Sequence, residues 1–514
     1  MPARGQSKPN TVDFALYFDS VVHDATECAM SSQDGEVAID KKVLNPAMSC
    51  PDMFSWKLFV DVVRQAWWTR WASDEQTWPK QPFKLCETEK PGPDCCLSDI
   101  HSNPGYDDPD NPALHCPYFP GDHTPVAALP GKPRRLGKPI GAHAVFLGRG
   151  SLATGLEALR ATPGEPEPGR VIRQEVGEIT VRNKEMFGYL FKNDLYNAQG
   201  IAKVFERNKE NLTNNAPYQA TNTAGALSKI DLPRQAIMIK SNWLFHTFAK
   251  DMGLTDDPAI PYIKKHMTTT LNEGSQDEKK YTGEHWLMSF HISTKDIPQW
   301  VWTTFEHVNN PGRCDFTGCN DSYGYASPDA HPQGTVSNFT TPHVRNDGLQ
   351  QSSTIFDLGK TYASGPISQG LATLFQALSI GTTAQASMEP LPTDKGWLSY
   401  RLKGSQVNFT NAMGRATRLG NAITEGGFMT TSSCITCHAR ASVAASGDKN
   451  KPLFPPLGVF LYDALSEVGY RQSAKGIPEK DWFHGSGGNP SLQALQTDFI
   501  WGMPFFAQPL ATPK

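Results

Sequence analysis

The chain has 514 residues, which is too long for one hydrophobic core and predicts about two to four domains. Its formal net charge of −4, with charged residues at 19% of the chain, gives no basis for binding nucleic acid. No apolar run comes near the ~18 residues of a membrane-spanning helix, and 43 Gly and 40 Pro indicate a globular protein rich in loops.

Residues 1–165 are predicted to form an irregular, disulfide-rich region with one regular element. Over residues 53–71, large apolar residues from Trp56 to Trp71 recur at spacings of three and four, which predicts a helix. Its tryptophan stripe is expected to face the core, and the alternatives are a path for electrons or a face that binds sugars or aromatic ligands. A Pro/Gly-rich stretch at 161–171 marks a boundary.

The cysteines indicate an oxidising compartment. Of the ten in the chain, eight lie in loop-like sequence: Cys28, Cys50, Cys86, Cys95, Cys96, Cys116, Cys314 and Cys319. An even number in such sequence predicts disulfides, although their pairing cannot be read from the sequence. Asp107, Asp108 and Asp110 in the same region could hold Ca²⁺, but solvated turn residues explain this run as well.

Residues 166–405 are predicted to form an antiparallel β-rich domain that holds a substrate or a partner. The runs 285–292 and 299–308 are both β-rich, and the six residues between them predict a hairpin with a long loop. The other expected elements are two short helices within 182–210, a strand over 235–249, a helix over 367–379 and a strand over 397–408.

This region carries the candidate catalytic side chains His246, His285, His291, Glu306 and His307. Strand alternation predicts that His285 and His291 share a face, yet about 20 Å of strand separates them, so one metal cannot bind both unless the strand bends. Two of the histidines with Glu306 would make the facial triad of a non-haem iron site. The alternatives are hydrogen-bonded core histidines and an acid/base next to a redox cofactor.

The last region, residues 406–514, surrounds the sequence Cys434-Ile435-Thr436-Cys437-His438. Two residues between the cysteines let one helical turn present both thiols, and the adjacent histidine projects beside them. This spacing is typical of covalent haem attachment, with both thiols bonded to the vinyl groups and His438 on the iron. A zinc site would need a second Cys or His pair, for which only His484 is available after the motif.

The elements around the motif predict a helical domain. A helix is expected over 408–425, ended by Gly426 and Gly427, and another within 491–507. Helix, motif, loop and helix is the order of a small c-type cytochrome. The whole chain is therefore predicted to be an α+β protein, with a disulfide-containing N-terminal region and an antiparallel β-rich domain followed by a C-terminal all-α cytochrome c-like haem domain.

Met503 is the predicted sixth ligand of the iron. Pro504 would keep the backbone there out of a helix, and Trp501 would exclude water. Met429, His484, an open position and a ligand from the N-terminal part of the chain are the alternatives. Arg440 could pair with a haem propionate or lie on the surface as an ordinary arginine.

Several short segments accompany the motif: residues 55–60, 236–243, 302–307, 418–421, 433–439 and 501–505. With these segments the chain resembles a group of large, single-haem bacterial cytochrome c family proteins over most of residues 50–510. The resemblance implies a periplasmic or secreted redox protein and supplies no substrate. Dihaem peroxidases and rubber oxygenases carry two C-x-x-C-H motifs, whereas this chain has one.

These features predict an exported c-type haem oxidoreductase that passes electrons through one covalent haem. Its partner would be a redox protein or a small-molecule electron donor or acceptor. A haem peroxidase or oxygenase with an open distal site and a non-catalytic electron-carrier subunit are the alternatives. The first ten residues lack the apolar segment of a signal peptide, so we expect a mature chain from which the signal has been removed.

Overall fold

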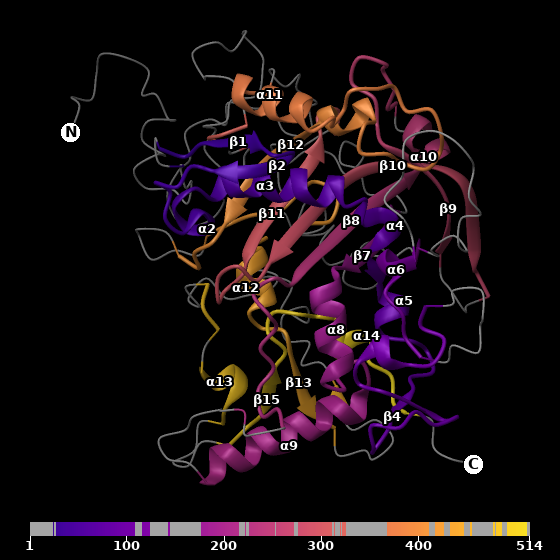
Figure 1. The fold of residues 1–514 in the computed structure, drawn as a ribbon, viewed down its shortest axis with the longest axis vertical. Helices are drawn as coiled ribbons and strands as arrows, with labels where there is room; N and C mark the ends of the chain where they lie inside the picture. The colour runs from indigo at the N-terminus through magenta and orange to yellow at the C-terminus, as the bar shows by residue number, and fades with distance from the viewer. Residues whose placement is uncertain are drawn as a thin grey trace, which may run out of the picture.

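The fold comes from a computed structural model (Figure 1). The described residues are 24, 27–107, 116–123, 142–143, 176–214, 222, 226–251, 253–271, 276–310, 313, 319, 321–324, 367–410, 417–425, 432–446, 453–454, 476–478, 480–485 and 491–510. The predictions made for Asp108, Asp110, Cys314 and Met429 lie outside these residues. The domain boundaries at residues 165 and 405 stay predictions.

A central antiparallel sheet has the strand order β12–β11–β10–β8–β7 (Figure 1). Its strands are β7 (Val176–Arg182), β8 (Ile237–Phe245), β10 (Lys279–Thr294), β11 (Val301–His307) and β12 (Tyr400–Gln406). Strands β10 and β11 pair from Ser289 opposite Glu306 to Thr294 opposite Val301, which confirms the predicted hairpin. The strand expected over 235–249 ends at Phe245, where helix α10 (His246–Asp251) begins.

One end of this sheet closes on itself. Strand β9 (Lys264–Leu271) pairs with the first half of β10, and β6 (Ala142–His143) joins β9 to β7. Strands β10, β8, β7, β6 and β9 therefore form a ring of neighbours, which β6 closes through one residue pair with β7 and two with β9. The short strand β3 (Ala72–Ser73) pairs with the end of β7.

Helix α3 (Pro51–Arg64) crosses one face of the sheet, as Figure 1 shows. The Phe59 ring centroid lies 5.0 Å from that of Phe305 and 5.8 Å from that of Phe290. Helix α11 (Gln369–Ala377) adds Phe375, which stacks on Phe59 at 5.8 Å. This face of the sheet is therefore a packed aromatic core.

The tryptophan stripe predicted over 53–71 faces this core. Trp56 and Trp67 are fully buried, which confirms the core interpretation. The single predicted helix is divided in two, because Ala66 has a φ of 50° and stops α3 before α4 (Trp67–Arg70) begins.

Helices α8 (Lys184–Lys192) and α9 (Ala198–Asn214) confirm the pair expected within 182–210, and they lie beside the C-terminal segment in Figure 1. Helix α8 begins at Asn183, whose side-chain oxygen accepts a hydrogen bond from the Met186 N–H. The minor elements are β1 (Met30–Gln33), β2 (Glu36–Ile39), α2 (Pro46–Ser49), α5 (Asp74–Thr77), β4 (Lys84–Leu85), β5 (Cys95–Cys96), η1 (Ile100–Ser102), α6 (Pro120–His123), η4 (Lys395–Ser399) and α13 (Lys480–Phe483).

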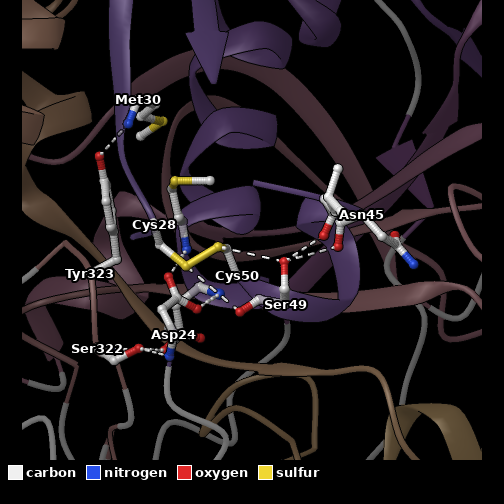
Figure 2. The surroundings of a disulfide bond; sticks show 11 residues. Asp24, Cys28, Met30, Asn45, Ser49, Cys50, Ser322 and Tyr323 are labelled. Atoms are coloured by element: carbon white, nitrogen blue, oxygen red, sulfur yellow. Dashed lines mark hydrogen bonds between the residues drawn. A yellow bond between two sulfur atoms is a disulfide. The ribbon is translucent and has the colours of Figure 1, made fainter. Parts of the chain in front are cut away.

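Disulfides form in the N-terminal region, as predicted. They join Cys28 to Cys50, Cys86 to Cys95 and Cys96 to Cys116, and Cys319 is also disulfide-bonded. Figure 2 shows the first bond near Asp24, and the Asp24 N–H donates to Ser322 Oγ at 3.0 Å. Asp24 also accepts from the backbone N–H groups of Asp52 and Met53 in the first turn of α3. The disulfide and Asp24 thus connect the segment before β1 to the start of α3.

The C-terminal region is not the all-α domain that the sequence predicts. Strand β13 (Ser442–Ala445) pairs with β14 (Leu453–Phe454) and β15 (Ala494–Gln496) in an antiparallel sheet. The motif helix α12 (Cys434–His438) and helix α14 (Gly502–Phe506) have only 5 residues each. The region is mixed, with short strands and helices, and the predicted fold class is wrong in this part.

Local backbone conformation explains why the two longer helices do not form. Asn421 Oδ1 accepts hydrogen bonds from the N–H groups of Ile423 and Thr424, which holds the described part of 408–425 in turns. Near the end of the chain, Asp498 and Phe499 have φ values of 47° and 68°. Left-handed backbone at two successive residues interrupts a helix within 491–507.

Candidate covalent haem site

The motif forms one short helical turn that contains two free thiols. Cys434 and Cys437 in α12 are partly buried and are not joined to each other. Because residues three apart share a helix face, one ligand can reach both sulfur atoms. Burial raises the pKa of Cys437 to about 11 and raises the pKa of Cys434 well above its ordinary value. Both side chains are therefore neutral thiols, whereas the other described cysteines form disulfides.

The imidazole of His438 is oriented by a main-chain carbonyl. Its Nδ1 lies 2.8 Å from the Phe499 oxygen, and since a carbonyl only accepts, Nδ1–H is the donor. The lone pair of the ring is then on Nε2. Burial lowers the pKa of His438 to about 4, so the ring is neutral at pH 7. A neutral imidazole with one nitrogen held by a carbonyl is the usual arrangement of a metal-binding histidine.

Two residues of the central sheet hold the motif in place. The ring of Trp302, in the second position of β11, lies 4.3 Å from the His438 ring centroid, with 37° between the planes. Gln406, at the end of β12, accepts from the Ile435 N–H at 2.9 Å and donates to Ser433 Oγ at 2.9 Å. The motif therefore lies against the end of the sheet where the β10–β11 hairpin turns.

The sheet face toward the motif is polar. The strand register sets His291 opposite Lys240 and Thr304, and Ser289 opposite Asn242 and Glu306. All of these side chains except Lys240 are buried. Since side chains two residues apart on a strand share a face, these groups share one face with Trp302 and Gln406.

His291 is the centre of a buried network on this face. Its Nε2 lies 3.4 Å from Glu425 Oε1 and 3.2 Å from Asn421 Nδ2, while its Nδ1 is buried without a hydrogen-bond partner. The Asn421 N–H donates to Glu425 Oε2 at 2.7 Å. Burial opposes ionisation of Glu425, but His291 and the Asn421 N–H together hold its pKa below the ordinary value.

This network and the motif share one electrostatic environment. Lys240 pairs with Glu178 at 2.9 Å, and although burial opposes its charge, Glu178 raises the pKa of Lys240. After burial and the Phe499 carbonyl, Lys240 and His291 are the next influences on the pKa of His438, and both lower it. The sheet face is near the motif, because Trp302, which contacts His438, stands opposite Ser293 on the face that also carries His291.

Two further residues predicted for the site are buried. Met503 in α14 is 1% exposed and belongs to the same hydrophobic cluster as Phe499. Arg440 donates to the Thr436 carbonyl at 2.8 Å, so part of its guanidinium serves the backbone of the motif helix. Iron ligation by Met503 and propionate binding by Arg440 stay predictions.

His285 lies apart from His291. A β-bulge between Leu287 and Ser289 shifts the alternation of β10, so that Leu287 joins the aromatic core with Phe290. His285 therefore lies on the same face of the sheet as Leu287, and His291 lies on the opposite face. The prediction that the two histidines share a face is wrong. Its Nε2 lies 3.0 Å from Thr269 Oγ1, and burial lowers its pKa to about 4.

The remaining catalytic candidates have structural partners. His246 Nδ1 lies 3.1 Å from the Glu284 carbonyl oxygen, and His307 stacks on Tyr262 at 3.6 Å. Burial lowers the pKa of His307 to about 3. Within the described residues, no group of three or more His, Cys, Asp or Glu side chains could hold a metal ion, so the predicted facial triad is not assembled there.

Glu306 binds the backbone of the loop that carries Asn421. Its Oε1 accepts from the Ala422 N–H at 2.8 Å and lies 3.3 Å from Lys403 Nζ, and both charged side chains are fully buried. Of the other candidates, His484 forms a β-bridge with Leu492, and Asp107 is exposed.

Sequence reasoning missed Lys240, Trp302, Gln406, Asn421 and Glu425. Lys240 and Asn242 are polar residues two apart in β8, which places both on one face of the sheet. Glu425 carried no local signal, because its partner His291 is far away in sequence.

Comparisons with protein-family models, with curated proteins and with solved structures found no match to this chain. Among the described residues, no helix has the length and apolar character needed to cross a membrane.

Proposed function

We propose that this chain carries one haem c, bonded to Cys434 and Cys437 and held by His438, and that it works as an exported haem oxidoreductase. The observation that carries the proposal is that both cysteines of the motif are free thiols. Two thiols on one helical turn remain unpaired in a chain whose other described cysteines form disulfides. Beside them, His438 has Nδ1 tied to the Phe499 carbonyl, which leaves Nε2 for iron.

The chain's own residues fit such a group. When bound, haem c supplies one-electron transfer. His438 is positioned by the Phe499 carbonyl and by Trp302, and the helix that carries the thiols is anchored through Gln406. The polar sheet face places a histidine with an unpartnered nitrogen near the motif, which is a donor suited to a metal. A structural zinc site would need four ligands, and among the described residues no group of three or more His, Cys, Asp or Glu side chains could hold a metal ion.

The disulfides support an oxidising cellular compartment. Such bonds persist in oxidising compartments, and covalent haem is normally attached there too. A periplasmic or secreted redox protein, similar to the large single-haem cytochrome c proteins, accounts for both features. A redox protein or a small-molecule electron donor or acceptor would exchange electrons with it.

The direct test is expression with export in a host that matures c-type cytochromes. We expect a pyridine haemochrome spectrum showing one covalent haem per chain, and loss of the covalent haem in a Cys434→Ala/Cys437→Ala variant. His246→Gln is the control, because that partly exposed histidine lies away from the motif. A wild-type chain without covalent haem would refute the proposal.

Electron transfer is tested separately on the purified holoprotein. We expect a reversible one-electron titration of the haem and rapid exchange with a small redox mediator. Rapid turnover of hydrogen peroxide by a high-spin ferric protein would instead favour the peroxidase alternative.

A further inference from the structure

The side chain of His291 uses only one of its two ring nitrogens. Only 8% of the residue is exposed, and Nε2 faces Glu425 and Asn421 while Nδ1 has no hydrogen-bond partner. Buried polar atoms in folded proteins are nearly always satisfied, so an orphaned ring nitrogen indicates a missing partner. At Nδ1 the missing partner is either a group that takes the nitrogen lone pair, as a metal does, or an acceptor for an N–H hydrogen bond.

His291 and His438 are arranged alike. In His438, Nδ1 is held by the Phe499 carbonyl, and in His291, Nε2 lies 3.4 Å from Glu425 Oε1. A metal at Nδ1 requires the tautomer with the proton on Nε2, which then donates to Glu425 Oε1, while the Asn421 Nδ2 group at 3.2 Å, itself a donor, keeps its hydrogen bond to Thr304 Oγ1. A carboxylate on the far nitrogen is the usual support of a metal-binding imidazole, because it fixes the tautomer and the ring orientation.

The support of His291 is itself rigid. Glu425 is fixed through Oε2 by the Asn421 N–H at 2.7 Å. The Asn421 side chain donates to Thr304 Oγ1 at 3.0 Å, and its oxygen accepts from two N–H groups of the same loop. Asn421 and Glu425 therefore hold the position of the His291 ring.

The location of His291 relative to the motif follows from the strand register. His438 rests on Trp302, and Trp302 stands opposite Ser293 in the β10–β11 pair. His291 is two residues before Ser293 on the same face, which makes it a diagonal neighbour of Trp302 at about 7–8 Å between α-carbons. A haem attached to Cys434 and Cys437 lies within reach of this part of the sheet.

We propose that His291 is the sixth ligand of the haem iron, opposite His438, and that Glu425 positions it. The proposal rests on the covalent haem of the proposed function. It replaces Met503 as axial ligand, and Met503 then serves as a core residue in the hydrophobic cluster that also contains Phe499. Two histidine ligands give a lower reduction potential than a histidine and a methionine.

The wild-type holoprotein provides the first test and needs no variant. We expect a low-spin ferric spectrum without the methionine–iron band at about 695 nm, and electron paramagnetic resonance typical of two imidazole ligands. A ferric methionine–iron band that disappears in Met503→Leu would overturn the proposal. A high-spin wild-type spectrum would do the same.

Variants then identify the histidine. His291→Gly should convert the ferric haem to high spin, and added imidazole should restore the low-spin spectrum, which a merely structural defect would not allow. Met503→Leu and His246→Gly are the matched controls and should keep the wild-type spectrum. A low-spin, two-imidazole spectrum that survives in His291→Gly without added imidazole shows that another histidine is the ligand.

Glu425→Gln tests the positioning role. Loss of the carboxylate makes the imidazole a weaker electron donor, so the midpoint potential should rise while the spectrum stays low-spin. An unchanged potential would show that Glu425 does not act on the ligand. Covalent haem in pyridine haemochrome combined with no effect of His291→Gly would end this inference alone, whereas absence of covalent haem would end the proposed function with it.

Discussion

The two faces of the central sheet carry opposite chemistry. On the face under α3, Phe290 and Phe305 pack with Phe59 in a cluster of aromatic rings. On the other face, the alternate residues His291 and Thr304 both lie beside Asn421, whose Nδ2 donates to Thr304 Oγ1. The same strands thus supply a hydrophobic core and a polar site, because successive side chains point to opposite sides.

The difference shows how stability and function are divided in this fold. Apolar burial on the α3 face is non-directional and provides most of the folding free energy. The polar face depends on pairs of buried groups, each costly if its partner is lost. A site at the motif can therefore be altered through single hydrogen bonds, while the opposite face responds mainly to lost volume.

On the apolar face, the largest loss of stability is expected from Phe59→Ala. The ring contacts Phe290, Phe305, Phe375 and Trp397, and its removal leaves a cavity, so the free energy of unfolding should fall by about 4 kcal/mol. Urea unfolding measures the change. Phe506→Ala, at a ring that is 40% exposed, is the control and should cost much less. A loss below about 1 kcal/mol for Phe59→Ala would contradict the core assignment.

On the polar face, the largest effect is expected from Glu306→Ala. This variant leaves the buried Lys403 ammonium and the Ala422 N–H without their carboxylate, and should cost about 3 kcal/mol of unfolding free energy. The double variant Glu306→Leu/Lys403→Met should recover part of that loss, since it removes both charges. If the double variant were as unstable as the sum of the single changes, the pair would not be coupled.

A smaller effect is expected where the sheet holds the motif. Gln406→Ala removes the acceptor of the buried Ile435 N–H and should lower the free energy of unfolding by about 2 kcal/mol. It should also lower the yield of covalent haem, because α12 loses an anchor. Gln369→Ala, on the exposed start of α11, is the matched control. Equal haem yields in the two variants would argue against anchoring by the sheet.

The smallest effect of a substitution is expected among the acidic groups at the start of α3. Burial, together with the charge of Asp52, raises the pKa of Asp24 to about 8 and the pKa of Asp321 to about 7. Both values exceed the ordinary 3.8, so the unfolded chain ionises first as pH rises. Stability should therefore fall progressively between about pH 4 and pH 8.

Asp52→Asn tests this pH dependence. It removes the neighbouring charge, so the pKa values of Asp24 and Asp321 should drop and the variant should lose about 1 kcal/mol less than the wild type between pH 5 and pH 8. Urea unfolding at the two pH values measures it, with Asp107→Asn on the surface as control. Parallel pH profiles of wild type and Asp52→Asn would contradict the predicted coupling.

Local patterns in the sequence predicted several elements correctly. Alternation and composition predicted the β10–β11 hairpin, and the apolar spacing from Trp56 onward predicted α3. These predictions succeeded because period and propensity act between near neighbours. Where a single residue changed the backbone, the same rules failed: Ala66 ended α3 early, and the bulge after Leu287 separated His285 from His291.

By itself, the sequence determined that Cys434, Cys437 and His438 stand together, since their spacing needs only one helical turn. It also determined that the chain forms disulfides. The tertiary structure alone decided what surrounds the motif, because Glu425 meets His291 across 134 residues of chain, from 291 to 425. It also replaced the expected helices near the motif with strands and turns. Long-range contacts select among local conformations that differ little in free energy, so local rules could not reveal that outcome.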